Sequence, residues 1–228
     1  NIADLHLALG RNFFYLQEYN DAITEYGRAN ALNPRDSTPE TLISRTYAIN
    51  GDYQKAIQYS EAALLDEPQN PFLYGNLGLI YSSATQYLDA IDFLRIAIRG
   101  GSSSDGAPVE GIPMAYGRVA QYYYTYGLAL AREGQCGEAI QISLAIQNGL
   151  RNDDVAVYNA EEMVKICEGT ATENGEDTRR TDMCMTPSEA FCSTAYRALE
   201  RRFTRICWNF PESTLTGSLP QDESGLMA

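Results

Sequence analysis

The chain has 228 residues, 44% of them hydrophobic, so it can bury a sizeable core in one or two domains. Its formal net charge of -13 would repel a nucleic-acid backbone, because such binding depends on Lys and Arg neutralising phosphates. No apolar run approaches the roughly 20 residues of a membrane-spanning helix, so we expect no membrane span in this segment. The sequence begins at Asn1 without an initiator Met or a leader, and we expect part of the natural N-terminus to lie upstream.

Comparing the sequence with itself reveals a repeat of 34 residues. An Ala-Ile pair begins at Ala22, Ala56 and Ala90, and again at Ala139 after 49 residues, which is one repeat plus 15. The same register aligns small residues, aromatic residues, alanines and prolines in further columns: Gly10, Ser44, Gly78 and Gly127; Phe13, Tyr47 and Tyr81; Ala29, Ala63 and Ala97; Pro34 and Pro68.

This pattern resembles the tetratricopeptide repeat over residues 3–168. The resemblance implies an all-α fold, a right-handed α-solenoid in which each helix hairpin is buried only against its neighbours. The residues agree with that fold, because small side chains let the two helices of a hairpin approach closely. Proline cannot continue a helix, so Pro34 and Pro68 should each end one hairpin before the next begins.

In chain order, the sequence predicts four helix pairs and a terminal helix within the solenoid of residues 1–168. The predicted helices are 3–16 with 19–32, 38–50 with 53–65, 71–84 with 87–99, 114–133 with 136–148, and a terminal helix at 154–168. Asn152, Asp153 and Asp154 are candidates for the cap at the start of the terminal helix. The 15 additional residues fall in an insert at 100–113, whose composition predicts a loop. A phosphate-binding loop is excluded there, because the Lys-Ser/Thr ending is absent.

Beyond the repeats, the sequence predicts a polar linker at 169–185, an amphipathic C-terminal helix at 186–208 and a tail at 209–228. The helix has a start signal at Thr186-Pro187-Ser188-Glu189 and an apolar face that includes Phe191 and Leu199. It could cap the solenoid or dock on a partner or a membrane surface, and its mixed charges favour the cap.

Five cysteines lie between Cys136 and Cys207, without a Cys-x-x-Cys pair or a nearby His. Zinc is therefore not expected, and no metal or other cofactor is predicted. In the repeat fold, Cys136 and Cys167 would share one edge, which predicts a disulfide between them; buried thiols are the alternative. Clustered cysteines favour an extracytoplasmic or secreted location over a cytoplasmic one.

Catalytic chemistry is not expected. The only histidine, His6, lies in the first helix at an aromatic-rich column, where a packed or capping role is favoured over that of a base. A nucleophile needs a base within hydrogen-bond reach, and none can be argued here. The adjacent Glu161 and Glu162 point to different sides of a helix, so they do not form a carboxylate pair.

The resemblance instead implies a non-catalytic scaffold that binds a protein or peptide partner in a concave groove along the first helices. Positions near the small-residue column predict the groove residues: Leu7, Arg11, Phe14, Thr41, Arg45, Ala48, Leu79, Ser82, Tyr124 and Leu128. The Lys and Asn residues with which some members of the family hold chaperone tails are absent from these positions.

Arg11 and Arg45 occupy equivalent positions in the first two repeats of an acidic chain. We expect them to bind an acidic or C-terminal carboxylate group, since unpaired cations in a groove repel one another. The alternative is that each pairs within the chain, Arg11 with Asp4 or Glu25, and Arg45 with Glu40 or Asp52.

A second class of function is also compatible with the sequence. The chain has 16 Tyr, two Lys and the amphipathic helix of residues 186–208, which suit a permanent assembly. In that hypothesis the chain is a structural subunit that forms a homo-oligomer through the C-terminal helix and tail.

Overall fold

The computed structural model describes residues 1–173, with side chains as far as residue 169. Contacts divide the chain into two units, Asn1–Gly175 and Glu176–Ala228, and the described residues all belong to the first. The predicted linker after residue 173, the C-terminal helix at 186–208 and the tail lie outside the described residues.

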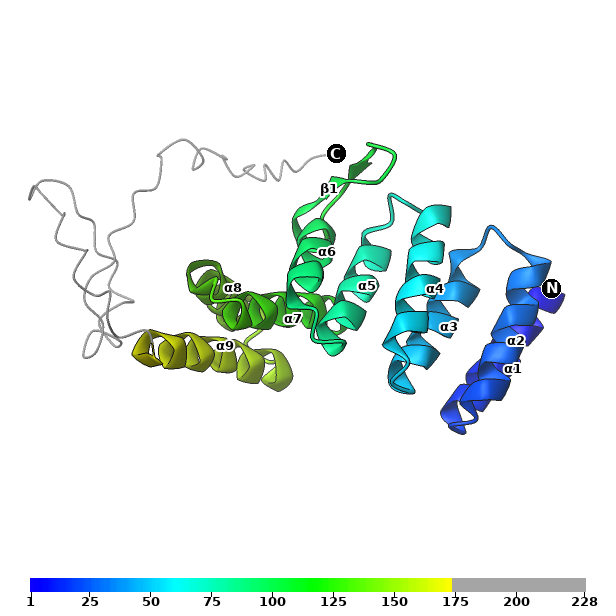
Figure 1. Ribbon diagram of the computed structural model, residues 1–228, viewed down its shortest axis with the longest axis horizontal. Coiled ribbons are helices and arrows are strands. Elements are labelled where there is room, and N and C mark those ends of the chain that lie inside the picture. Colours follow the sequence, from blue (N-terminus) through cyan, green and yellow to red (C-terminus); the bar gives the residue numbers. More distant parts are fainter. Residues whose placement is uncertain (174–228) are drawn as a thin grey trace, which may run out of the picture. The chain divides into compact units, whose positions relative to one another are not determined.

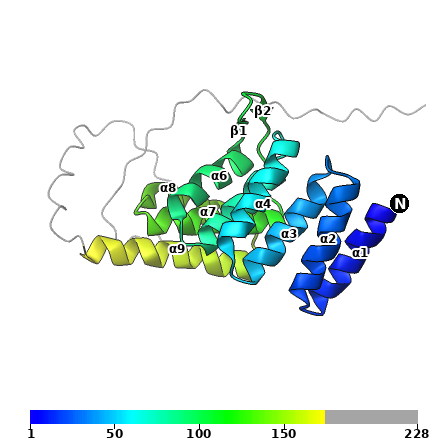
Figure 2. The ribbon, with the colours of Figure 1, turned by 45° about the vertical axis from the view of Figure 1, so that its right-hand side comes forward.

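The described part consists of consecutive helix hairpins, as the 34-residue register predicts. Hairpins α1–α2, α3–α4, α5–α6 and α7–α8 follow one another in chain order, and α9 packs on both α7 and α8 (Figures 1 and 2). Their bounds are α1 Ile2–Tyr15, α2 Tyr19–Leu32, α3 Ser37–Ile49, α4 Tyr53–Asp66, α5 Pro71–Ser83, α6 Tyr87–Arg99, α7 Arg118–Arg132, α8 Cys136–Gly149 and α9 Asp154–Glu173. This is the all-α fold of tandem helix hairpins that the sequence predicts.

Every hairpin turns in the same way. The residue two positions after the end of each first helix has a positive φ. The amide of the residue that follows it donates a hydrogen bond to the carbonyl five residues earlier. The positive-φ residues are Gln17, Gly51, Thr85 and Gly134, and the matching bonds run from Glu18, Asp52, Gln86 and Gln135. Glycine suits this left-handed conformation, whereas the β-branched Thr85 adopts it at a cost.

Within each hairpin, the small-residue column allows close contact between the helices. A Cβ atom at Gly10 would lie 2.5 Å from the Tyr26 ring, and one at Gly78 would lie 2.6 Å from Leu94. The second hairpin has Ser44 instead, whose hydroxyl donates to the Ala56 carbonyl at 2.6 Å and lies 2.6 Å from that of Ser60. The polar group of this serine is therefore satisfied within the core.

The insert is folded rather than an irregular loop, which corrects the sequence prediction. Strands β1 (Gly101–Ser102) and β2 (Pro108–Val109) form a short antiparallel hairpin, so the solenoid also contains a sheet that was not predicted. Val109 and Ile112 are buried, and the Ile112 amide donates to the Ala97 carbonyl at 2.8 Å. These anchors hold the insert on α6, and α7 begins at Arg118 rather than at 114.

The terminal helix α9 begins where capping predicts, since the Ala156 amide donates to the Asp153 carboxylate at 3.0 Å. It continues to Glu173, past the predicted end at residue 168, so the first residues assigned to the linker are helical. The Sγ atoms of Cys136 and Cys167 are 2.21 Å apart, which is disulfide distance. This pair joins the start of α8 to α9.

We expect Thr85→Gly to raise the free energy of unfolding by about 0.5–1 kcal/mol, because it relieves the left-handed strain of a β-branched residue. The matched change Gly51→Thr, at the same place in the preceding hairpin, should lower it by about 1 kcal/mol or more. Chemical denaturation of both variants measures these changes. Equal effects of the same sign would contradict the assignment of strain to this turn.

We expect Cys136 and Cys167 to resist alkylation when no reductant is present, and intact-mass analysis with peptide mapping would show it. Cys136→Ser with Cys167→Ser should lower the free energy of unfolding by about 3 kcal/mol, as loss of a cross-link of this length does. Modification of both thiols in the native chain would show that they are reduced.

Candidate functional site

The predicted groove residues lie at repeat-equivalent positions of the first helices. Helix α1 carries Leu7, Arg11 and Phe14, and α3 carries Thr41 and Arg45. Helices α5 and α7 carry the other four, Leu79, Ser82, Tyr124 and Leu128. Both arginines are exposed, whereas Phe14, Thr41 and the residues of α5 and α7 are half-buried.

Leu7 does not belong to this set. Its side chain is 8% exposed and packs in a core cluster with Tyr26 of α2 and Ile43 of α3. The first helix turns this position toward the next hairpin, so Leu7 contributes to stability rather than to a binding surface.

Three of the predicted residues come together around one small cavity between the first two hairpins. The cavity has a volume of about 70 Å³. Its lining consists of Arg11, Phe14, Tyr15, Tyr26, Leu42 and Arg45. Two arginines and two tyrosines thus line a space with room for a small group.

The aromatic side chains of the cavity hold its polar groups in place. The Arg45 guanidinium carbon lies 5.3 Å from the centre of the Phe14 ring, a cation–π contact that fixes its position. Tyr26 is 1% exposed, and burial raises the pKa of its hydroxyl. Arg11 and Arg45 act in the opposite direction on that pKa, because both positive charges lie near the phenol.

The acidic side chains that could have neutralised these arginines have other partners. Asp52 pairs with Lys55 at 2.8 Å. Glu25 binds His6 at 2.6 Å and Arg28 at 2.5 Å, while Glu40 accepts from Asn30. Among the described residues, no ion pair joins Arg11 or Arg45 to a carboxylate, so intramolecular pairing does not account for them.

The remaining predicted residues do not line the cavity. Leu79, Tyr124 and Leu128 pack against the core cluster of α6–α9, and the Thr41 hydroxyl donates to the Ser37 carbonyl at 2.9 Å. Sequence reasoning missed Tyr15, Tyr26 and Leu42. Tyr26 could have been noticed from its position in the repeat, because the equivalent residues of the other hairpins are not aromatic: Ser60, Leu94 and Ser143.

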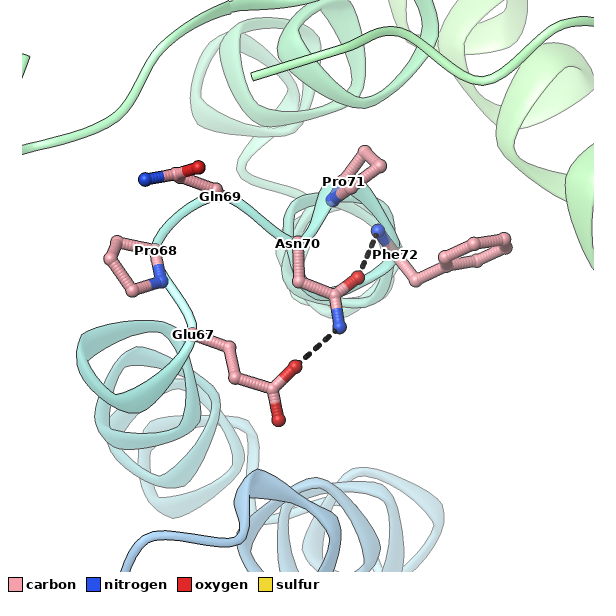
Figure 3. Close-up of a pocket in the computed structure, with 6 residues that line it drawn as sticks. All are labelled: Glu67, Pro68, Gln69, Asn70, Pro71 and Phe72. Carbon is pink, nitrogen blue, oxygen red and sulfur yellow. Dashed lines mark hydrogen bonds between the residues drawn. The ribbon is translucent and has the colours of Figure 1, made fainter. Parts of the chain in front are cut away.

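A larger hollow of about 540 Å³ lies at the turn between α4 and α5. Figure 3 shows its lining, six consecutive residues from Glu67 to Phe72. The polar groups there serve the turn itself: the Asn70 amide donates to Glu67 at 2.8 Å, and the Phe72 amide donates to Asn70 at 3.1 Å. Because these groups are already paired, we do not regard the hollow as the binding site.

A carboxyl group with a perturbed pKa lies nearby, where α2, α3 and α4 meet. Burial raises the pKa of Glu40, the neighbouring Asp66 carboxylate raises it further, and the Asn30 amide acts in the opposite direction. The Oε2 atom of Glu40 and the Oδ1 atom of Asn30 are buried without hydrogen-bond partners. The sequence suggested Glu40 only as a possible partner of Arg45; its contact with Asn30 and Asp66 was not predicted.

The described residues offer little else of catalytic or metal-binding character. His6 has the packed role expected of it, with its Nδ1 on the buried Glu25. In the described range, no three His, Cys, Asp or Glu side chains converge as metal ligands would. No helix there combines the length and apolar character that crossing a bilayer requires.

Comparison with known proteins agrees with the repeat and its geometry. The family model of the tetratricopeptide repeat matches residues 41–70, the span of most of α3 and all of α4. Residues 41–70 are therefore a tetratricopeptide repeat, and the other hairpins of the described part share its register. The chain is 38% identical over 68 residues to mouse (Mus musculus) tetratricopeptide repeat protein 21B; that match spans 30% of this chain and 5% of the relative.

Solved structures share the fold at low sequence identity. YrrB, described as a tetratricopeptide-repeat protein with an unusual peptide-binding site, is 18% identical with a TM-score of 0.52, covering 75% of this chain and 86% of that one. PilF of Pseudomonas aeruginosa is 14% identical with a TM-score of 0.56, covering 74% and 76%. Repeat proteins of this family are generally non-catalytic scaffolds for protein–protein interaction.

We expect Glu40→Gln to raise the melting temperature near neutral pH, with a gain of about 1 kcal/mol, because the amide can donate to Asp66 and carries no charge. A raised pKa in the folded state stabilises the fold at low pH and loses that contribution as pH rises. The gain should therefore shrink as the pH falls toward about 4, where glutamates become protonated. Melting curves over this range test it, with the exposed Glu110→Gln as control; a gain that does not depend on pH would contradict it.

Proposed function

We propose that the chain binds an extended segment of a protein partner along its first helices. Arg11 and Arg45 then hold an acidic side chain or a C-terminal carboxylate of that partner. The observation that carries this proposal is the cavity between the first two hairpins, which is lined by two arginines that make no ion pair among the described residues.

Electrostatics supports a carboxylate as the group bound there. Two cations beside one cavity repel each other, and a bound anion relieves that repulsion while accepting charge-assisted hydrogen bonds. A cavity of about 70 Å³ has room for a small group such as a carboxylate. Tyr26 also lines the cavity, and its hydroxyl is a candidate for a third donor.

The rest of the partner would extend from this cavity across α5 and α7. Leu79, Ser82, Tyr124 and Leu128 occupy the equivalent positions there and are half-buried rather than fully packed. Apolar and aromatic groups of this kind bind side chains of an extended peptide. The fold shared with YrrB, described as having a peptide-binding site, is consistent with a peptide partner.

A peptide library with a free C-terminal carboxylate, compared with the same library amidated, tests the proposal. The wild-type chain should enrich peptides with a free terminus or an acidic side chain near it. Arg11→Gln with Arg45→Gln should weaken binding of the selected peptides by about 1.5–3 kcal/mol per lost hydrogen bond. The melting temperature should change little, because neither arginine makes an ion pair among the described residues.

Arg35→Gln is the matched control, since it removes the same charge from the exposed turn between α2 and α3. Tyr26→Phe should weaken binding by about 1 kcal/mol while keeping the packing of the ring. If the double arginine variant binds as tightly as Arg35→Gln, both residues belong to the scaffold and the proposal fails.

A further inference from the structure

Each of the two arginines at the cavity is followed, four residues later, by an exposed apolar side chain. Arg11 is followed by Tyr15, which is 81% exposed, and Arg45 is followed by Ile49, which is 51% exposed. Residues four apart lie on the same side of a helix, one turn from each other. The first two hairpins therefore share one pattern, a cation with an apolar group about 6 Å further along the helix.

The exposure of these side chains is not a consequence of lying at the end of the array. The last residues of α1, α3, α5 and α7 are equivalent in the repeat, and all four are exposed: Tyr15, Ile49, Ser83 and Arg132. Helix α3 has a neighbouring hairpin on each side, and Ile49 is exposed nevertheless. Because the third and fourth hairpins have Ser83 and Arg132 here, only the two hairpins beside the cavity combine an arginine with an apolar residue.

Phe14 connects the apolar side chains to the arginines. The centre of its ring lies 6.0 Å from that of the Tyr15 ring, at an interplanar angle of 80°. The same ring centre lies 5.3 Å from the guanidinium carbon of Arg45. Tyr15 of α1 and Arg45 of α3 thus contact one aromatic ring, although they belong to different hairpins, and both line the cavity.

Helix electrostatics distinguishes the two levels of this surface. The last turn of a helix carries partial negative charge, so an anion beside Tyr15 and Ile49 would be repelled, whereas an apolar group would not. One turn earlier, Arg11 and Arg45 supply positive charge at the cavity. The surface therefore suits an anion at the level of the arginines and an apolar group at the level of the helix ends.

We infer that the bound segment is the C-terminal end of the partner and that its last residue has an apolar side chain, such as Leu, Ile, Met or Phe. In such a residue the carboxylate and the side chain leave the same Cα atom, so the two groups reach adjacent levels of the surface. The carboxylate lies at Arg11 and Arg45. The side chain packs on Tyr15 and Ile49.

This inference rests on the proposed function and selects between the two anions that it allows. An internal Asp or Glu has no apolar side chain beside its carboxylate, so it leaves Tyr15 and Ile49 exposed to water. A terminal Asp brings a second anion to the helix ends, where the partial charge opposes it. A terminal Leu or Phe both neutralises the arginines and removes apolar surface from water.

Short peptides of random sequence with a free C-terminus test the inference, when they are captured on the immobilised full chain and identified by mass spectrometry. The last position of the retained peptides should be enriched about tenfold in Leu, Ile, Met and Phe over Ser and Asp. The same library with an amidated C-terminus should be retained weakly. This comparison uses the unmodified protein, so it does not depend on whether a variant folds.

Two variants assign the preference to the helix ends. Ile49→Ser and Tyr15→Ser should each weaken binding of a retained peptide that ends in Leu by about tenfold. Binding of the same peptide ending in Ser should not change, because the contact is then missing from both sides of the comparison. Leu65→Ser is the matched control, since Leu65 is 77% exposed on α4, and it should bind as the wild type does.

The outcomes separate this inference from the function on which it rests. Retention that requires the free carboxylate and both arginines, but not an apolar last residue, overturns the inference and leaves the proposed function intact. Equal retention of the amidated library through internal acidic residues, still dependent on Arg11 and Arg45, overturns it in the same way. Binding that Arg11→Gln with Arg45→Gln does not weaken, or a chain that retains no peptide, overturns both.

Discussion

Close contact between the two helices of each hairpin is the constraint from which the rest of this structure follows. At Gly10 and Gly78 there is no room for even a Cβ atom, because Tyr26 and Leu94 of the second helices occupy that space. Ala22, Ala56, Ala90 and Ala139 are fully buried on the opposite side of the same contacts. The short distance fixes the angle of each hairpin, and the repeated register then sets every hairpin against the next.

This contact also explains why the cavity lies where it does. In the first hairpin, the space left by Gly10 is filled by a tyrosine rather than by Ser60 or Leu94 of the later hairpins. The longer tyrosine reaches the cavity beside α3, where Arg11 and Arg45 are close enough to act on the pKa of its hydroxyl. A packing residue of the core thereby supplies a polar group to the surface, which the smaller residues of the other hairpins cannot do.

The repeat register accounts for how much of the fold could be predicted. Small residues at equivalent positions predict which helices form a hairpin, because each marks the same close contact between two helices: Gly10, Ser44, Gly78 and Gly127. The insert was predicted less well, because it occurs in one repeat only. The repeat pattern therefore gives no indication that Val109 and Ile112 are buried against α6. Arg11 and Arg45, which both line the cavity, could be related from the sequence because they recur in register. Leu7 was wrongly assigned and Tyr26 was missed, because the direction of a single side chain depends on the angle between neighbouring hairpins.

The position of the cavity at the joint between the first two hairpins bears on what a ligand bound there would do. In an array where each hairpin is stabilised only by its neighbours, the stability of each joint depends on the contacts across it. At the joint with α9, the Cys136–Cys167 pair adds a covalent cross-link to the packing of α9 on α7 and α8. A ligand held between Arg11 of α1 and Arg45 of α3 would likewise add contacts across the first joint, and its binding energy would appear as added stability of that joint.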